Sequence, residues 1–206
     1  MHVDHIEREW KIIVEGGEAM ERLLNALGDP DRIERQRNVY FDTADSSLRE
    51  LRRMLRVRIT GDSIVLTYKG RSTIVDGFMS SREVEADLDG ETWSAIEQGS
   101  QVISDLRHPP VIEALAGLDN PCLRGHAELH NLRRFYPRAA GYTLELDETR
   151  YPDGTVEHEI EAEVTPEQAE GVRRDLEGLL RSLALPMTPQ TRSKYARLLA
   201  RLPESS

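Results

Sequence analysis

The chain has little of what several classes of protein need. Its 206 residues include one cysteine, Cys122, so no internal disulfide can form, and no Cys/His spacing is typical of a zinc site. No stretch approaches the roughly 18 apolar residues of a membrane-spanning helix. The N-terminus also lacks the apolar core of a signal peptide. These absences predict a cytoplasmic protein in a reducing compartment, with no membrane partner.

The chain also has fewer basic residues than acidic ones. The sequence has 27 Lys and Arg against 37 Asp and Glu, for a formal net charge of −10. Surfaces that wrap nucleic acid carry a basic excess, so the composition predicts no nucleic-acid partner. Charged residues nevertheless make up 31% of the chain and hydrophobic residues 38%, a soluble globular balance with a lean core and many ionisable groups to place.

Periodicity predicts an antiparallel protein of the α+β class. No linker or low-complexity run divides residues 1–206, so we expect a single domain. Alternating apolar and polar residues predict eight strands, at 5–15, 36–42, 54–59, 63–70, 81–88, 127–137, 143–149 and 155–164. Helical spacing predicts helices at 18–27, 91–98, 165–183 and 190–202, with a further one at 111–118 inside the poorly patterned region 99–125. Turns at 60–62 and 152–154 join neighbouring strands as hairpins, which favours antiparallel pairing.

Most of the predicted strands carry charge on one face. A single charged face is typical of the solvated side of a sheet. Here the habit recurs along the chain, and the signs are segregated, with carboxylates on some strands and Lys or Arg on others. The same-face sets are Glu7, Glu9 and Lys11; Arg56 and Arg58; Thr67 and Lys69; Glu83 and Glu85; Asn131 and Arg133; Glu145 and Asp147; and Glu157, Glu159, Glu161 and Glu163.

Stacked carboxylates need cations beside them. Like charges two residues apart on a strand lie about 6–7 Å from each other and repel unless a cation lies between them. Hard divalent cations bind carboxylate oxygens and share their shell with water and phosphates, and Arg and Lys bind phosphate directly. Acidic and basic strands together therefore predict a site for a metal-bound polyphosphate. If the sheet closes, these faces point inward, and apolar residues such as Ile6, Trp10 and Ile12 point outward beneath the helices.

Motifs in a fixed order resemble those of a known family. Glu7, Glu9 and Lys11 form the pattern E-x-E-x-K, which resembles the N-terminal signature of the CYTH superfamily, also called triphosphate tunnel metalloenzymes. Further segments resemble that family in order: YFDT at 40–43, LRVR at 55–58, LTYKG at 66–70, REVE at 82–85, RRFY at 133–136, LDET at 146–149, EIEAE at 159–163 and SKY at 193–195. Each segment is weak alone, but the ordered set is specific and leaves only residues 99–125 unassigned.

The resemblance implies an eight-stranded antiparallel β-barrel, or tunnel, with a polar interior and helices packed outside. It also implies Mg²⁺ or Mn²⁺ as cofactor and a triphosphate-containing small molecule as partner. The triphosphate-binding residues by matched position are Lys11, Arg56, Arg58, Lys69, Arg133 and Lys194. The metal ligands are Glu7, Glu9, Glu159 and Glu161, and the catalytic residues are Lys11, Glu85 and Lys194. A second metal or a positioned water would be held by Glu83, Glu85, Glu145, Asp147 and Glu163. The alternative for Glu83, Glu85, Glu145 and Asp147 is that they only balance the internal positive charge.

Three functions remain open at this point. The favoured one is a metal-dependent hydrolase of inorganic triphosphate or another triphosphate, including thiamine triphosphate. The second is a class IV adenylate cyclase, in which the ribose 3′-oxygen of ATP attacks the α-phosphate; no adenine pocket is recognisable, so hydrolysis is preferred. The third is a non-catalytic polyphosphate-binding module. Capture of an anion needs only cations, so the accompanying carboxylates favour an enzyme.

Overall fold

Strands dominate the computed structural model, which describes residues 2–119 and 121–202. The strands are β1 (His2–Val14), β2 (Arg32–Thr43), β3 (Met54–Thr60), β4 (Ser63–Lys69), β5 (Thr73–Val75), β6 (Phe78–Asp87), β7 (Leu123–Pro137), β8 (Thr143–Arg150), β9 (Val156–Glu163) and β10 (Thr188–Pro189). The helices are α1 (Gly16–Leu27), α2 (Ser47–Glu50), α3 (Gly90–Glu97), α4 (Pro109–Leu115), α5 (Ala169–Ser182) and α6 (Lys194–Leu199), with a 3-10 turn at Ile103–Asp105. Among these residues no helix is long and apolar enough to span a bilayer.

The strands are hydrogen-bonded in the order β10-β1-β9-β8-β7-β2-β3-β4-β6-β5, and β1 also pairs with β6. A sheet in which a strand near one end bonds to one near the other is closed, so the predicted antiparallel β-barrel of the α+β class is confirmed. All eight predicted strands are present, as β1 to β4 and β6 to β9. The short β5 and β10 were not predicted, because two or three residues carry no usable periodicity.

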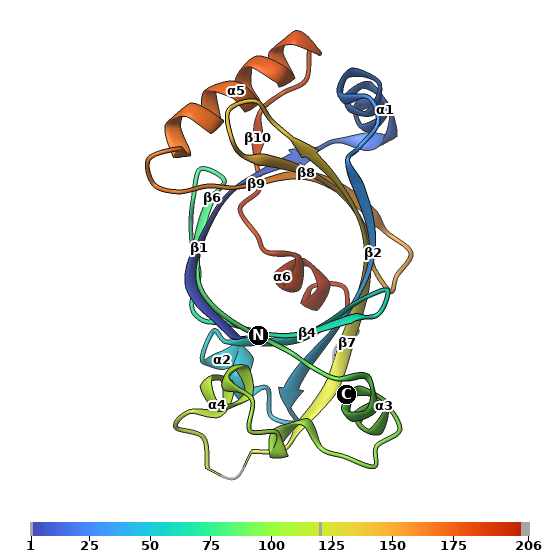
Figure 1. Ribbon diagram of the computed structural model, residues 1–206, viewed down its shortest axis with the longest axis vertical. Helices are drawn as coiled ribbons and strands as arrows, with labels where there is room; N and C mark the ends of the chain where they lie inside the picture. Colours follow the sequence, from blue (N-terminus) through green and yellow to red (C-terminus); the bar gives the residue numbers. More distant parts are fainter. Residues whose placement is uncertain (1, 120, 203–206) are drawn as a thin grey trace. The chain divides into compact units, whose positions relative to one another are not determined.

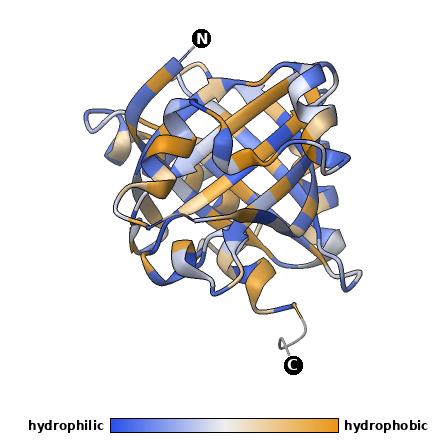
Figure 2. Cartoon of the chain, turned by 90° about the horizontal axis from the view of Figure 1, so that it is seen from below, coloured by the Kyte–Doolittle hydropathy of each residue, from blue (hydrophilic) through white to orange (hydrophobic). Residues whose placement is uncertain are grey.

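Contacts divide the chain into two compact units. The first comprises Met1–Ile6, Gln36–Ser72 and Ser81–Leu129, and the second comprises Glu7–Arg35, Thr73–Ser80 and His130–Ser206. Each unit has its own hydrophobic core on one side of its strands. Along the strands in Figure 2, hydrophilic and hydrophobic residues alternate, as expected where one face packs and the other carries charge.

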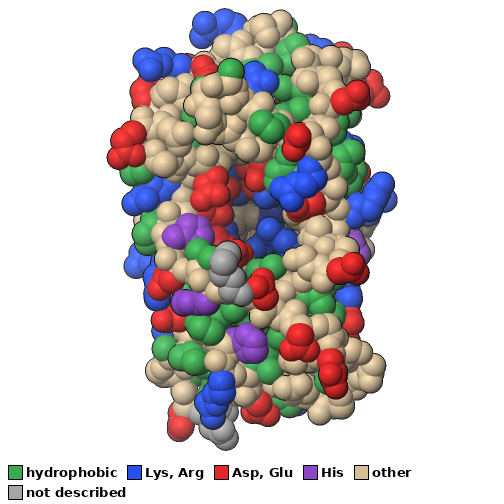
Figure 3. Space-filling view, viewed as in Figure 1, with side chains coloured by type: hydrophobic (Ala, Val, Ile, Leu, Met, Phe, Trp, Pro, Cys, Tyr) green, Lys and Arg blue, Asp and Glu red, His purple; other side chains and the backbone are tan. Residues whose placement is uncertain are grey.

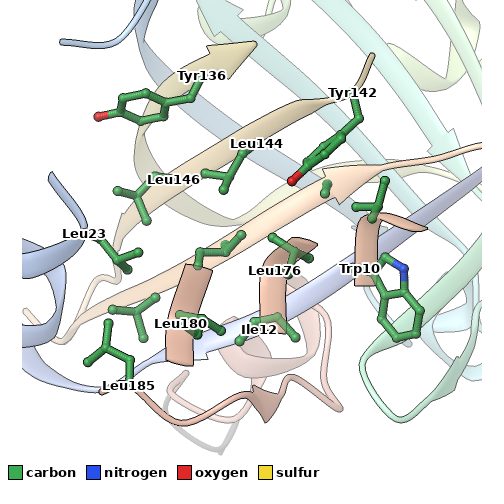
Figure 4. Close-up of a cluster of buried hydrophobic side chains, with 14 of the residues drawn as sticks. Trp10, Ile12, Leu23, Tyr136, Tyr142, Leu144, Leu146, Leu176, Leu180 and Leu185 are labelled. Carbon is green, nitrogen blue, oxygen red and sulfur yellow. The ribbon is translucent and has the colours of Figure 1, made fainter. Parts of the chain in front are cut away.

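In the second unit the apolar strand face packs against α5 and α1. Figure 4 shows Leu176 and Leu180 of α5 among strand residues that include Ile12 and Leu144, with Leu23 of α1 beside them. Helix α5 lies beside β8 and β9 in Figure 1. The apolar stripe of α5, spaced by three and four residues, matches this packing.

In the first unit α2, α3 and α4 cover the apolar face of β3 and β4. The buried cluster joins Leu55 and Val57 of β3 with Leu48 of α2, Trp93 of α3 and Val111 of α4. The strand faces predicted to be apolar are therefore buried in both units. Ile6 is an exception, since it is 46% exposed and so lies outside the helix-covered part of β1.

Two predicted helices begin four residues later than expected. Helix α5 begins at Ala169 rather than residue 165, because residues 166–168 form a turn in which the Thr165 carbonyl accepts from two backbone amides. Helix α6 begins at Lys194 rather than residue 190. The preceding segment, β10, pairs with β1, and the amide of Gln190 donates to the Lys11 carbonyl at 2.9 Å, so this backbone is not free to be helical.

Truncating a core leucine of α5 tests the packing. Leu176 is fully buried, at 0% exposed, and Leu176→Ala should lower the free energy of unfolding by about 2–5 kcal/mol through lost burial and a residual cavity. Urea denaturation measures the loss. The matched control is Leu51→Ala, at a side chain 47% exposed, which should change it by under about 0.5 kcal/mol. Equal effects of the two changes would contradict this packing.

Candidate active site

The charged face of the second unit is assembled by strand register. Lys11 of β1 lies opposite Glu161 of β9, which lies opposite Glu145 of β8. One step along the sheet, Asp147 of β8 lies between Glu159 of β9 and Arg133 of β7. Cross-strand neighbours have Cβ atoms about 4.5–5.5 Å apart, so residues far apart in sequence become direct neighbours on one face.

Three buried carboxylates come together on this face. Asp147, Glu159 and Glu161 each offer an oxygen within 4.8 Å of the other two, and their exposures are 0%, 2% and 4%. Carboxylate oxygens at this spacing are the donors that Mg²⁺ and Mn²⁺ prefer, so the group fits a divalent cation. Two of the predicted metal ligands, Glu159 and Glu161, belong to it. Asp147, predicted for a second role, is the third member, whereas Glu7 and Glu9 are not in the group.

Lys194 of α6 reaches all three carboxylates. Its Nζ lies 2.8 Å from Asp147 Oδ2 and 2.7 Å from Glu161 Oε1, and it also pairs with Glu159. Lys11 pairs with Glu161 as well, and its Nζ lies 2.9 Å from Glu9 Oε2. Five predicted site residues from β1, β9 and α6 are thus joined in one network with Asp147.

Arg133 adds a planar contact from β7. Its Nε donates to Asp147 Oδ1 at 2.8 Å and one terminal nitrogen donates to Oδ2 at 2.7 Å, a bidentate pair. The same guanidinium pairs with Glu145 and Glu161. Because a guanidinium stays charged and holds a fixed fork of donors, it suits phosphate as well as carboxylate.

The network holds Asp147, Glu161 and Lys194 in their charged forms. Burial alone would raise the pKa of the Asp147 carboxyl, but Arg133 and Lys194 outweigh burial and lower that pKa to about 2. In the same way Lys11, Lys194 and Arg133 hold the pKa of Glu161 well below its usual range despite burial. Burial disfavours the Lys194 ammonium, yet the surrounding carboxylates raise its pKa well above the ordinary value. The repulsion expected between stacked glutamates is therefore relieved by the protein's own cations.

The sequence analysis did not predict one residue of this network. Arg197 of α6 is 5% exposed, and both of its terminal nitrogens donate to Glu159 Oε2 at 2.8 Å. It lies three residues after Lys194, so both side chains leave the same face of a helix capped by Ser193 Oγ. That spacing was the available signal, but it also describes an ordinary helix surface.

The backbone at Lys11 is fixed by a turn and by β10. The Lys11 amide donates to the Gly77 carbonyl at 2.7 Å, and the Lys11 carbonyl accepts from Gln190 at 2.9 Å. Gly77 has a φ of +81°, and a Cβ there would lie 2.7 Å from the Lys11 oxygen and 3.0 Å from Pro189 Cβ. Only glycine fits this approach, so the hairpin between β5 and β6 positions Lys11.

The first unit has a charged face of its own. Arg56 lies 3.8 Å from Glu83 and donates to Thr67 Oγ1 at 3.3 Å, and that hydroxyl donates to Glu85 at 3.0 Å. Lys69 Nζ lies 3.0 Å from Glu83 Oε2. A further contact of this unit joins Arg58 Nε to Asn38 Oδ1 at 3.2 Å. The predicted residues of β3, β4 and β6 therefore also lie together within their unit.

The remaining predicted residues lie at the margins. Glu7 is half-buried on β1, and Glu163 is exposed at the end of β9, opposite Glu9. On the face shown in Figure 3, acidic side chains (red) and basic side chains (blue) are interspersed rather than gathered into one basic patch.

Comparison with known proteins identifies the family of the chain. A profile of the CYTH domain matches residues 5–195. The chain belongs to the CYTH family. No protein among the curated sequences compared gives a match, but solved structures do.

Two CYTH-type structures share more than a quarter of their residues with the chain. One is HpAC1 from Hippeastrum, a candidate adenylyl cyclase described as having a dominant triphosphatase activity. It is 27% identical with a TM-score of 0.82, over 94% of this chain and 95% of that one. The other, a candidate adenylate cyclase from Bacillus halodurans, is 26% identical with a TM-score of 0.73, over 94% and 97%. A Pyrococcus horikoshii protein, 18% identical with a TM-score of 0.63 over 95% and 99%, shares the fold.

Adding a methyl group at Gly77 tests how Lys11 is held. Gly77→Ala should lower the thermal midpoint by more than Gly154→Ala, because both positions have positive φ but only at Gly77 does the new Cβ meet backbone. The shared φ strain costs about 1–2 kcal/mol, and the clash adds to it. Thermal unfolding of the two variants gives the difference. Indistinguishable midpoints would mean that Gly77 does not pack closely on Lys11.

Proposed function

We propose that this CYTH protein is a divalent-metal-dependent hydrolase that cleaves inorganic triphosphate or another small molecule bearing a triphosphate. The observation that carries the proposal is the buried set in the second unit. There Lys11, Arg133 and Lys194 contact a group of carboxylates that itself fits a divalent cation. Side chains that can bind an anion therefore lie directly beside side chains that can bind a cation.

The cations of this set are suited to phosphate oxygens. In the ligand-free protein their donors are engaged by carboxylates, which keeps the buried charges paired. A triphosphate offers the same kind of acceptor in greater number, so Arg133 and Lys194 can transfer donors to it without leaving a charge unpaired. Lys11, Arg56, Arg58 and Lys69 are assigned to the same substrate from their motifs, and these assignments are part of the proposal.

Asp147, Glu159 and Glu161 would hold the metal, with Mg²⁺ and Mn²⁺ as the candidates. When bound, the metal supplies positive charge that offsets the negative charge of the phosphate oxygens. The protein's part is to place donors and acceptors in advance, which is the main source of acceleration in phosphoryl transfer. Lys194 must then turn from the carboxylates towards phosphate, since its ammonium contacts all three proposed ligands.

Hydrolysis is favoured over cyclisation by one comparison. HpAC1, at 27% identity over most of both chains, is described as a cyclase candidate with a dominant triphosphatase activity. The second candidate function is adenylate cyclase activity, favoured by the 26% identity with the Bacillus halodurans protein. The third candidate function is polyphosphate binding without catalysis. It does not explain why three carboxylates are buried with oxygens within 4.8 Å of one another.

One panel of assays tests the proposal. The purified protein is incubated with inorganic triphosphate, ATP, thiamine triphosphate and pyrophosphate, with Mg²⁺, with Mn²⁺ or with excess EDTA, while phosphate release and cyclic AMP are measured. We expect phosphate release from triphosphate that requires metal and stops on chelation. Cyclic AMP as the main product would favour the cyclase, and binding without turnover would favour the non-catalytic module. Full activity in EDTA would remove the metal from the proposal.

The substitution Glu161→Gln tests whether Glu161 belongs to the proposed site. The amide keeps the shape but cannot bind a metal as a carboxylate does or pair with Lys11, Lys194 and Arg133. We expect turnover to fall by orders of magnitude. The thermal midpoint should fall as well, because breaking a buried ion pair costs about 3–5 kcal/mol.

The matched control for this change is Glu18→Gln on α1, a side chain 88% exposed. It alters the same chemical group away from the site, so both turnover and midpoint should stay near those of the unchanged protein. Near-normal turnover in Glu161→Gln would contradict the assignment of Glu161.

A further inference from the structure

We infer that Arg197 is a positioning residue: it holds one oxygen of Glu159 so that the other is presented to the divalent cation. The inference rests on the proposed function, because it takes Asp147, Glu159 and Glu161 as the metal-binding group. It concerns a residue outside the matched motifs, which end with Tyr195.

The two oxygens of Glu159 have different surroundings. Oε2 accepts from both terminal nitrogens of Arg197, each at 2.8 Å. Oε1 faces the other side, where it pairs with Lys194, the side chain that also contacts Asp147 and Glu161. Arg197 therefore occupies the oxygen on the far side of the carboxylate group and leaves the near oxygen for whatever cation sits there.

Arg197 is itself held in place. Its Nε donates to the Tyr151 hydroxyl at 3.0 Å and lies 3.1 Å from Glu157 Oε2, and Tyr151 in turn donates to Glu157 at 3.1 Å. Arg201, one turn later, pairs with Glu157 and stacks on the Tyr151 ring at 4.3 Å from its centre. Arg197 and Tyr151 are 5% and 3% exposed, so little room is left for another rotamer.

Arg197 therefore orients Glu159 as a metal ligand and does not bind the metal itself. A carboxylate held through one oxygen has its orientation fixed and its basicity tuned, and loss of such outer partners commonly weakens metal binding 10–100-fold. Among the described residues, Tyr151, Glu157 and Arg201 make no hydrogen bond or ion pair with Asp147, Glu159 or Glu161. Their effect on the site runs through Arg197.

A positioning role and a purely electrostatic role for Arg197 predict opposite changes in cation affinity when Arg197 is removed. Arg197 carries a positive charge next to a cation site, so its removal should strengthen cation binding if charge were its only role. If Arg197 positions Glu159, its removal should weaken cation binding. The metal affinity of the free protein therefore separates the two roles without any measurement of turnover.

The experiment titrates Mn²⁺ alone into the substrate-free full chain by calorimetry. We expect Arg197→Met to weaken Mn²⁺ binding at least about tenfold. Tyr151→Phe, which keeps every charge and removes only the hydroxyl that holds Arg197, should weaken it by a smaller factor. Mn²⁺ binding should also be weakened in Arg197→Lys, because an ammonium cannot form the hydrogen bonds to Glu159 and Tyr151 at the same time as a guanidinium does.

The matched control is Arg201→Met. It removes the same charge from the next turn of the chain, where the side chain contacts Glu157 rather than Glu159. Arg201 reaches Glu159 only through Arg197, so Arg201→Met should weaken Mn²⁺ binding by a much smaller factor than Arg197→Met. Far-ultraviolet circular dichroism and thermal unfolding check that each variant folds. If Arg197→Met does not fold, Tyr151→Phe carries the test, because it keeps every charge and removes only the hydroxyl that Arg197 bonds.

The outcomes show separately whether the positioning role of Arg197 fails or the proposed metal-binding group fails. Equal or tighter Mn²⁺ binding in Arg197→Met, or an unchanged affinity in Tyr151→Phe where Arg197→Met does not fold, overturns the positioning role while the metal site stands. Equal weakening in Arg197→Met and Arg201→Met also overturns it, since general disruption of α6 would then explain both. A starting protein that binds no Mn²⁺ overturns the metal-binding group and the inference together.

Discussion

The pairing of buried charge is the constraint on which the second unit depends. Asp147, Glu159 and Glu161 are almost fully removed from water, and an isolated buried carboxylate would cost several kcal/mol. Each is instead bound by a Lys or Arg side chain from another element. The apolar side of the same strands is packed against α5 and α1, so both strand faces are buried. A strand slip of one residue would exchange the two faces and lose both sets of contacts.

The same pairing would suit this face to the proposed triphosphate. Lys194 and Arg133 already point their donors at oxygens, and a triphosphate presents oxygens of the same kind. Neighbouring cations hold the pKa of Glu161 well below its usual range and also lower that of Asp147, so these two carboxyls are already ionised. Binding can therefore proceed by exchange of partners within a formed network, which avoids the cost of creating charge in a buried place. Pairing with the protein's own Lys and Arg side chains explains how these ionisable groups are buried.

Helix α6 links this network to the end of the chain. It is six residues long and contributes Lys194 and Arg197 from one face, which reach Asp147, Glu159 and Glu161 between them. So short a helix is not stable by its own backbone hydrogen bonds. Its ion pairs, the Ser193 cap and the burial of Leu198 hold it, so the site and the helix stabilise each other.

The sequence by itself determined the strands, the charged faces and the family. Alternation along 5–15 or 155–164 is a local property, set by the two-residue repeat of a strand, and it also showed that Lys11 and Glu161 lie on charged faces. It could not show which charges would meet. The union of Asp147 with Glu159 and Arg133 depends on strand register, and the bonds from Arg197 to Glu159 depend on where a short terminal helix docks. These contacts join residues up to about 40 positions apart, so only the tertiary structure decided them, because sequence patterns report the face of a strand and not its partner.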